Sequence, residues 1–142
     1  MAHYRESIRD YETLNLGDFE FQSGTTIPDA KLAYKTYGKL NNKASNAIVV
    51  VHGVNGTHES TASVLIEGEE RAISPKRHFI IAPNMFGNGV SSSPSNTPPP
   101  FEGPDFPPVT IYDNVRAQHK LVTEKLGISK LKLVAGSSMG GL

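Results

Sequence analysis

The chain has 142 residues, of which 37% are hydrophobic and 20% are charged, and this composition is typical of a globular domain rather than a disordered or membrane protein. Its 14 basic and 14 acidic side chains balance, so no net charge favours nucleic acid or an anionic membrane as a partner. Cysteine is absent, which excludes disulfides and thiolate metal sites.

The N-terminal segment, residues 1–17, is polar and weakly patterned. We interpret it as an arm with at most a short helical turn. Its charges are mixed and no apolar segment follows them, so we expect no signal peptide. No apolar run in the chain approaches the ~20 residues that span a bilayer. We therefore expect a cytoplasmic protein that does not enter the membrane.

Three strand regions are expected in the first two thirds of the chain. Alternating hydrophobic residues from Phe19 to Tyr37 predict a β-hairpin, with its turn at residues 23–26 and a break at Pro28-Asp29. The β-branched run at residues 46–51 is typical of a central parallel strand covered on both faces. Residues 78–83 predict a second buried strand.

Two helices are expected between these strands and the end of the chain. Residues 59–73 predict the first, although Gly68 interrupts it. Thr110 and Asp113 fit a capping box that begins the second, and Gly127 ends it. Its basic side chains, Arg116, Lys120 and Lys125, are expected to be solvated. Its buried face is expected to consist of the hydrophobic residues spaced by three, four or seven positions, which are Ile111, Val115, Val122 and Leu126.

The alternation of strands and helices predicts a parallel sheet with right-handed crossovers. The Ser- and Pro-rich residues 91–108 would, taken alone, suggest a linker or a polyproline recognition segment. However, Phe101 and Phe106 favour a loop packed against the domain, because isolated linkers seldom contain aromatic residues.

The last stretch, residues 131–142, is an apolar run followed by the motif G-x-S-x-G at residues 136–140. This motif is typical of the sharp strand-to-helix turn that exposes a serine above an α/β-hydrolase sheet. The motif predicts that Ser138 is a nucleophile and that the Met139 amide faces the oxygen on which charge develops. A glycine-rich turn without catalytic function stays an alternative for the pentapeptide alone.

Polar segments follow both buried strands, at the sheet edge where α/β folds bind ligands. In the hydrolase arrangement the loop after the first of these strands contributes a second oxyanion amide, which we assign to Val54. His52 is interpreted as structural, because general bases in this fold follow the serine. His58 and Glu59 lack a third ligand at useful spacing, so we expect no metal. Residues 84–89 are either a second crevice loop or a simple turn after the strand.

Four segments in this order resemble the homoserine O-acetyltransferase family: FEGPDFP at 101–107, VTIYDNVRAQ at 109–118, LGI at 126–128 and GSSMGG at 136–141. The resemblance extends from about Leu32 to the end of the chain. It implies an α/β-hydrolase fold whose N-terminal portion is a β-hairpin followed by parallel strands with crossover helices. It also implies that Ser138 takes an acyl group from acyl-CoA as a co-substrate and transfers it to a hydroxyl, and no bound cofactor is expected. Met139 and Val54 match the oxyanion positions.

Two crevice segments depart from the family pattern. Residues 54–56 read VNG where the family typically has LTG, and residues 91–94 read SSSP where it has a GSTGP-type loop. These departures leave the acceptor open between homoserine, another alcohol and water. The last of these would make the protein an esterase.

The triad of this fold runs Ser, then Asp or Glu, then His, but only four residues follow Ser138 and all five histidines precede it. We therefore expect residues 1–142 to be a partial domain, truncated just after the serine turn and inactive alone. The alternative is a non-catalytic half-domain that pairs with a separate C-terminal chain or with a second copy. A nucleotide-binding fold is not favoured, because no G-x-G-x-x-G follows a strand.

Overall fold

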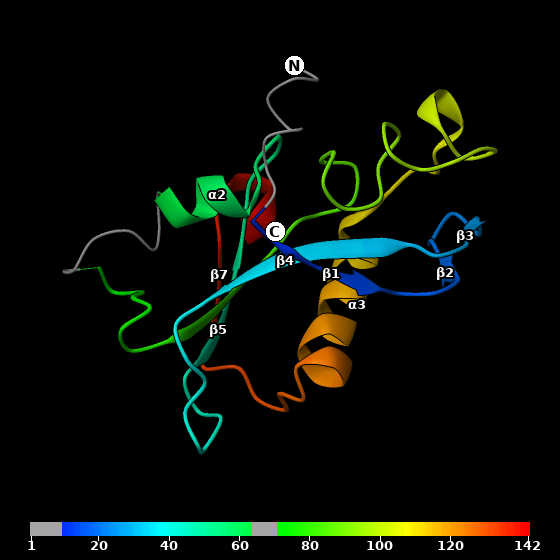
Figure 1. Ribbon diagram of the computed structural model, residues 1–142. Coiled ribbons are helices and arrows are strands. Elements are labelled where there is room, and N and C mark those ends of the chain that lie inside the picture. The colour runs from blue at the N-terminus through cyan, green and yellow to red at the C-terminus, as the bar shows by residue number, and fades with distance from the viewer. Residues whose placement is uncertain (1–9, 64–70) are drawn as a thin grey trace.

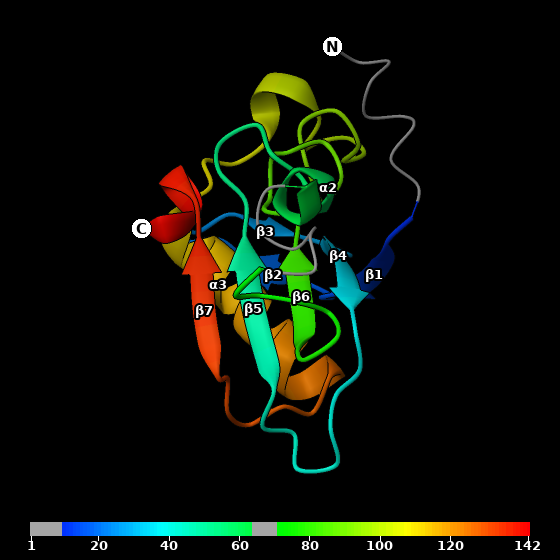
Figure 2. The ribbon, with the colours of Figure 1, turned by 90° about the vertical axis from the view of Figure 1, so that its left-hand side faces the viewer.

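The computed structural model describes residues 10–63 and 71–142 and contains a mixed five-stranded sheet (Figures 1 and 2). The strand order is β1-β4-β6-β5-β7. β5 is parallel to both β6 and β7, whereas β4 is antiparallel to both β1 and β6. The strands are β1 (Glu12–Asn15), β4 (Lys31–Tyr37), β5 (Ala47–Val51), β6 (Phe79–Pro83) and β7 (Leu133–Gly136).

β5 is the central strand that the β-branched run predicts, and every one of its residues is buried. Val49 and Val51 pack in the larger core, which includes Ala117 of α3 (Ile111–Lys120) and Leu121, which follows that helix. Ile48 and Val50 pack in a smaller core on the opposite face. A strand buried on both faces therefore lies between two layers, with α3 on one side and α2 (His58–Thr61) on the other (Figure 2).

The predicted hairpin is right for residues 19–27 and wrong for residues 31–37. β2 (Phe19–Glu20) and β3 (Thr26–Ile27) pair in a small separate sheet. The chain then turns at Pro28-Asp29, where Asp29 has a φ of 51°, and residues 31–37 enter the main sheet as β4. The main sheet offers that strand two partners, β1 and β6, instead of one.

The predicted N-terminal arm is wrong for residues 12–15, which form β1 at the edge of the main sheet and pair with β4. Residues 1–9 lie outside the described part of the chain. The first predicted helix begins at His58 after a capping box at Thr57. Residues 64–70 of that prediction also lie outside the described part, and residues 71–73 are not helical.

The predicted start and end of the helical segment that begins with α3 are confirmed. The Thr110 hydroxyl accepts a hydrogen bond from the Asp113 amide, and the Asp113 carboxylate accepts one from the Thr110 amide. α3 continues into one turn of π-helix, Leu121–Lys125, and Gly127 follows with a φ of 65°.

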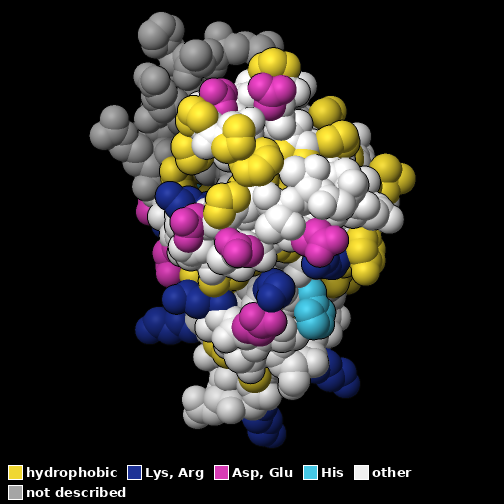
Figure 3. Space-filling model, turned by 90° about the vertical axis from the view of Figure 1, so that its right-hand side faces the viewer, with side chains coloured by type: hydrophobic (Ala, Val, Ile, Leu, Met, Phe, Trp, Pro, Cys, Tyr) yellow, Lys and Arg dark blue, Asp and Glu magenta, His cyan; other side chains and the backbone are white. Residues whose placement is uncertain are grey.

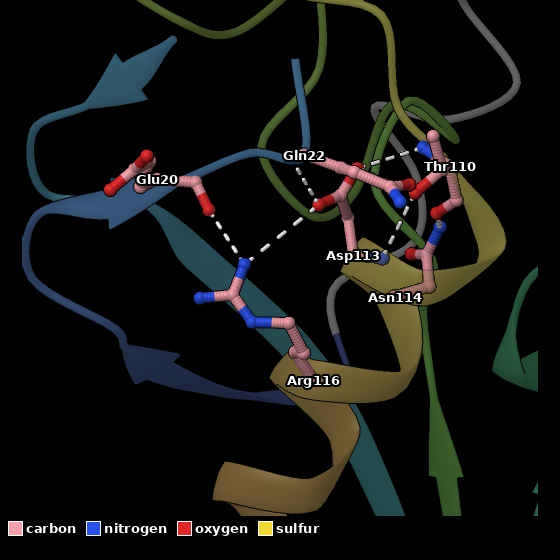
Figure 4. A network of polar contacts seen from close by, with 6 residues as sticks. All are labelled: Glu20, Gln22, Thr110, Asp113, Asn114 and Arg116. Carbon is pink, nitrogen blue, oxygen red and sulfur yellow. Dashed lines mark hydrogen bonds and ion pairs between the residues drawn. The ribbon is translucent and has the colours of Figure 1, made fainter. Parts of the chain in front are cut away.

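The predicted buried face is right for Val122, which is 7% exposed, and for Leu126, which packs against the larger core, but wrong for Val115, which is 53% exposed. The buried residues of α3 itself are Asp113, Asn114 and Ala117. The two polar residues are buried because they bond to backbone amides of other segments, and Figure 4 shows the bond of Asp113 to Gln22. The Asp113 carboxylate accepts from the Gln22 amide at 2.7 Å, and the Asn114 side-chain oxygen accepts from the Phe86 amide at 2.8 Å. Such bonds compensate for the loss of hydration on burial.

Arg116 also differs from the prediction of a solvated side chain. Its guanidinium donates to the Glu20 carbonyl at 2.7 Å (Figure 4). It also lies 4.9 Å from the centre of the Phe19 ring. The bond to Glu20 and the bond of Asp113 to Gln22 hold α3 against the small β2–β3 sheet.

The loop at residues 91–108 contains a short 3-10 helix, η2 (Gly103–Asp105), and is packed against the domain. Phe101 and Phe106 pack against the larger core, and the Phe106 ring lies 6.2 Å from that of Phe21. This confirms the prediction drawn from the two aromatic residues.

The face of the molecule in Figure 3 carries acidic and basic side chains close together, while hydrophobic side chains gather towards its upper end. Among residues 10–63 and 71–142, no helix has the length and hydrophobicity to cross a bilayer.

Candidate active site

The serine turn follows β7 directly. Ser137 keeps an extended backbone, with a φ of −118°, whereas Ser138 has a φ of 53° and begins the 3-10 helix η4 (Ser138–Gly141). A non-glycine residue in the left-handed region costs about 1–3 kcal/mol and is commonly found at functional sites. Ser138 is exposed. The chain therefore makes the sharp bend that G-x-S-x-G predicts, with the serine at its apex.

Gly136 and Gly140 are the residues that permit this bend. A Cβ on Gly136 would overlap the carbonyl oxygen of Gly140, and a Cβ on Gly140 would lie 2.5 Å from the carbonyl oxygens of both Val51 and His52. Both clashes are with backbone atoms, which cannot move aside as a flexible side chain can. The two glycines therefore let the turn close on itself and against the end of β5.

The loop after β5 lies against the serine turn. A Cβ on Gly53 would be 3.2 Å from the Ser137 carbonyl oxygen and 3.3 Å from the Ser138 Cβ. A cavity of about 330 Å³ beside the turn is lined by Ser137 and by the 51–56 segment, which includes Val54. The structure thus brings Ser138, Met139 and the Val54 segment to one edge of the sheet, while their catalytic roles stay predictions.

His52 connects the loops after β5 and β6. Its Nε2 accepts a hydrogen bond from the Met85 amide at 3.0 Å, so the ring proton is on Nδ1, which donates to the Gly53 carbonyl at 2.7 Å. The side chain is buried. These bonds to backbone confirm the interpretation of His52 as structural.

Two asparagines form a second connection between the loops after β5 and β6, which was not predicted from the sequence. Asn84 is fully buried, and its side-chain oxygen accepts from the His58 amide at 3.1 Å and from the Asn88 side chain at 3.2 Å. The Asn88 side chain also donates to the Gly56 carbonyl at 3.3 Å. These bonds hold residues 84–89 against the loop after β5, so the segment is more than a simple turn. The sequence feature that could have indicated this network is a pair of asparagines, four positions apart, after a buried strand.

Serines of the next segment extend this network. The Ser91 hydroxyl donates to the Asn84 carbonyl at 2.6 Å and accepts from the Ala33 amide at 2.8 Å. The Ser93 hydroxyl donates to the Ser91 carbonyl at 2.6 Å. Residues 91–94, which depart from the acetyltransferase pattern, thus hold residues 84–89 against β4.

The four described histidines take different places in the fold. His52 and His58 belong to the loop network, and His119 is exposed on α3. His78 precedes β6, at the end of the sheet opposite the serine turn. Burial, with Lys132 and Arg77 nearby, lowers the pKa of His78 below its usual range. Among the described residues, no cluster of three His, Asp or Glu side chains could hold a metal ion.

Comparison with known proteins identifies the fold family. Residues 46–142 match the family described as the alpha/beta hydrolase fold. The chain belongs to this family. Its parallel strands β5, β6 and β7, its crossover helices and its serine turn are those of an α/β hydrolase, as the sequence predicts, whereas the antiparallel β1 and β4 make the whole sheet mixed.

Two relatives illustrate the range of activities within this α/β-hydrolase family. The chain is 44% identical over 135 residues to an ethyl acetate hydrolase from Pseudomonas veronii, covering 95% of this chain and 38% of that protein. It is also 44% identical over 135 residues to a homoserine O-acetyltransferase from Methanohalobium evestigatum, covering 85% of this chain and 27% of that protein. The predicted resemblance to homoserine O-acetyltransferases is confirmed.

Solved structures give the same two groups. The acetyl esterase MekB matches with a TM-score of 0.90 and 43% identity, over 96% of this chain and 39% of that chain. A homoserine O-acetyltransferase from Bacillus anthracis matches with a TM-score of 0.78 and 29% identity, over 92% of this chain and 40% of that chain. The chain thus spans less than half the length of these α/β hydrolases and corresponds to an N-terminal segment of their fold.

Proposed function

We propose that this chain supplies the nucleophile and the oxyanion hole of a serine esterase that hydrolyses short-chain esters such as acetates. The observation that carries the proposal is the backbone of Ser138, which has a φ of 53° immediately after β7 and lies against Gly53. A serine held in this way is presented to a substrate rather than packed in the core.

In the proposed reaction the Ser138 Oγ attacks the ester carbonyl carbon, and its proton passes to a histidine base from a polypeptide segment beyond the described residues. The Val54 and Met139 amides donate hydrogen bonds to the oxyanion. The bond to the alkoxy group then breaks, and the alcohol leaves with the proton. Water attacks the acyl-serine, releases the carboxylic acid and restores Ser138.

The second candidate function is acyl transfer. The same acyl-serine would form from acyl-CoA, with release of CoA, and the hydroxyl of homoserine or another alcohol would take the acyl group. The higher TM-score with the acetyl esterase, 0.90 against 0.78, supports water as the acceptor. The departures from the acetyltransferase pattern at residues 54–56 and 91–94 support it further.

The two candidates are tested with the chain mixed with a separately produced polypeptide that carries the rest of the hydrolase domain of the Pseudomonas veronii relative. We expect hydrolysis of p-nitrophenyl acetate and Ser138-dependent labelling by a fluorophosphonate. Acetylation of homoserine that requires acetyl-CoA, without ester hydrolysis, would favour the second candidate. A mixture in which the two polypeptides form a complex but the fluorophosphonate does not label Ser138 would contradict both.

A further inference from the structure

A cavity of about 610 Å³ lies where β1, the segment from β3 to β4 and the loop at residues 90–98 meet. It shares no lining residue with the cavity beside the serine turn. β1 and β4 also lie at the end of the strand order away from β7. The cavity is therefore separate from the proposed ester site, and its volume is in the range of about 300–1,000 Å³ that is usual for small-molecule sites.

Hydrogen bonds fix the loop that forms one wall of this cavity. The Ser92 amide donates to the Lys31 carbonyl at 2.9 Å, and the Ser92 hydroxyl accepts from the Lys31 amide at 2.8 Å. The Thr97 hydroxyl donates to the Ser93 carbonyl at 2.8 Å, and the Ser93 amide donates to the Asn96 side chain at 2.8 Å. A wall held in this way is already in place before a ligand arrives, which lowers the entropic cost of binding.

The facing wall includes Asp29, at the turn that leads into β4. Its φ of 51° lies in the left-handed region, where a non-glycine residue costs about 1–3 kcal/mol and is commonly found at functional sites. Backbone bonds hold this turn, since the Ala30 amide donates to the Gly17 carbonyl at 3.0 Å. Among the described residues, the Asp29 carboxylate accepts one long bond, from the Asn15 side chain at 3.5 Å. The carboxylate therefore keeps most of its capacity to accept hydrogen bonds.

Lys31, another lining residue, differs from the second lysine on the same face of β4. The ammonium group of that second lysine, Lys35, pairs with Asp10 at 2.6 Å. In the described part of the chain, neither Lys31 nor Asp29 takes part in an ion pair. One cavity thus has an ammonium group and a carboxylate group that do not neutralise each other.

This combination selects the charge of a ligand. A ligand with a single charge would pair with one of the two side chains and meet a like charge on the other, whereas a zwitterion would pair with both. Four lining residues, Ile27, Pro28, Val90 and Pro98, are apolar and suit an apolar side chain on that ligand.

We propose that this cavity binds a zwitterionic amino compound, either a free amino acid or a short peptide. The ligand's ammonium group pairs with Asp29, its carboxylate pairs with Lys31, and its side chain contacts the apolar lining. The proposal does not depend on the proposed ester chemistry, because the two sites share no residue.

The test is a titration of the ¹⁵N-labelled 142-residue chain, followed by NMR, with L-leucine and separately with L-leucyl-L-leucine. At least one of these compounds should shift the amide signals of residues 27–31 and 90–98, and the two titrations distinguish a free amino acid from a peptide. The same compound with its amine acetylated or its carboxylate amidated should bind at least tenfold more weakly, because each change removes one charge.

Asp29→Asn and Lys31→Gln test the two charges on the protein, and each should raise the dissociation constant at least tenfold. Asparagine tolerates a positive φ, so the first variant keeps the turn. Asp105→Asn and Lys43→Gln are the matched controls, since both residues are exposed and neither lines the cavity. The controls should bind like the parent chain.

Three results would overturn the proposal. The first is that neither compound binds, or that the shifted signals belong to residues 51–56 and 136–141 instead. The second is that the acetylated and amidated compounds bind as well as the zwitterion. The third is that Asp29→Asn and Lys31→Gln bind no more weakly than the two control variants.

Discussion

Two loop regions at the same edge of the sheet are held in different ways. The loops after β5 and β6 are fixed by buried side chains, including His52, Asn84 and Asn88, that bond to backbone groups and to one another. The serine turn after β7 is shaped instead by backbone packing around Gly136 and Gly140, and its serine is exposed. Side-chain hydrogen bonds fix the first region, whereas the second depends on two glycines that have no side chain.

Because of this difference, the two regions depend to different degrees on the rest of a hydrolase domain. Among the described residues, no buried side-chain nitrogen or oxygen lacks a hydrogen-bond partner, so the loops that carry Val54 are already organised within this chain. The serine turn lies beside Leu133 and Val134, which are 44% and 60% exposed. We infer that the oxyanion side is preorganised, whereas the nucleophile side leaves apolar side chains of β7 exposed.

The largest effect is expected from Ser138→Ala in the chain mixed with the complementary hydrolase polypeptide. Loss of the nucleophile should reduce ester hydrolysis by about 10⁴-fold or more. The measurement is the rate of p-nitrophenyl acetate hydrolysis. Ser137→Ala is the control, because this neighbouring serine is exposed and makes no capping hydrogen bond. Equal losses in the two variants would show that the turn, and not the Ser138 hydroxyl, is what the reaction requires.

Gly136→Ala tests whether backbone packing shapes the nucleophile side. The added Cβ would overlap the Gly140 carbonyl oxygen, so the turn must open and displace Ser138. A displacement of about 1 Å is expected to cost about 10²-fold in rate. At Gly141, by contrast, an added Cβ would lie 3.5 Å from the Gly136 carbonyl oxygen, an ordinary contact. Gly141→Ala should therefore keep most of the activity, and an equal loss there would contradict this account.

Asn84→Ala tests the side-chain network on the other side. The variant leaves the buried amide of His58 without its acceptor and removes the side-chain bonds of Asn84 to the Ala33 carbonyl and to Asn88, so the free energy of unfolding should fall by about 2–4 kcal/mol. Urea denaturation of the 142-residue chain measures this change. Asn42→Ala, at an exposed loop asparagine, should change stability by less than about 0.5 kcal/mol. Similar values for both variants would mean that the network does not stabilise the loops.

Features with local causes were predictable from the sequence. The capping box at Thr110, the end of the helical segment at Gly127 and the bend at Ser138 each depend on a few neighbouring residues. β5 was predictable because an unbroken β-branched run has few alternatives to a buried strand.

Features with distant causes were not predictable. Asp113 and Asn114 turn inward because they bond to the amides of Gln22 and Phe86, which are 91 and 28 positions away. That choice leaves Val115 outside, contrary to the hydrophobic pattern. Similarly, the four residues of β1 form a strand because β4 is available to pair with them.

The smallest predicted effect concerns pH and separates the two ends of the sheet. Burial, Lys132 and Arg77 lower the pKa of His78 in the folded state, so the unfolded chain binds more protons when the pH falls. The stability associated with His78 should be complete above the usual histidine pKa of about 6.5 and should decline as the pH falls below it.

Urea denaturation at pH 7.5 and 5.5 should show a smaller acid-induced loss of stability for His78→Gln than for the parent chain, and His119→Gln should resemble the parent. Because His78 lies opposite the serine turn, its replacement should leave fluorophosphonate labelling at pH 7.5 unchanged. A change in labelling would mean that the crevice is not organised independently of that end of the sheet.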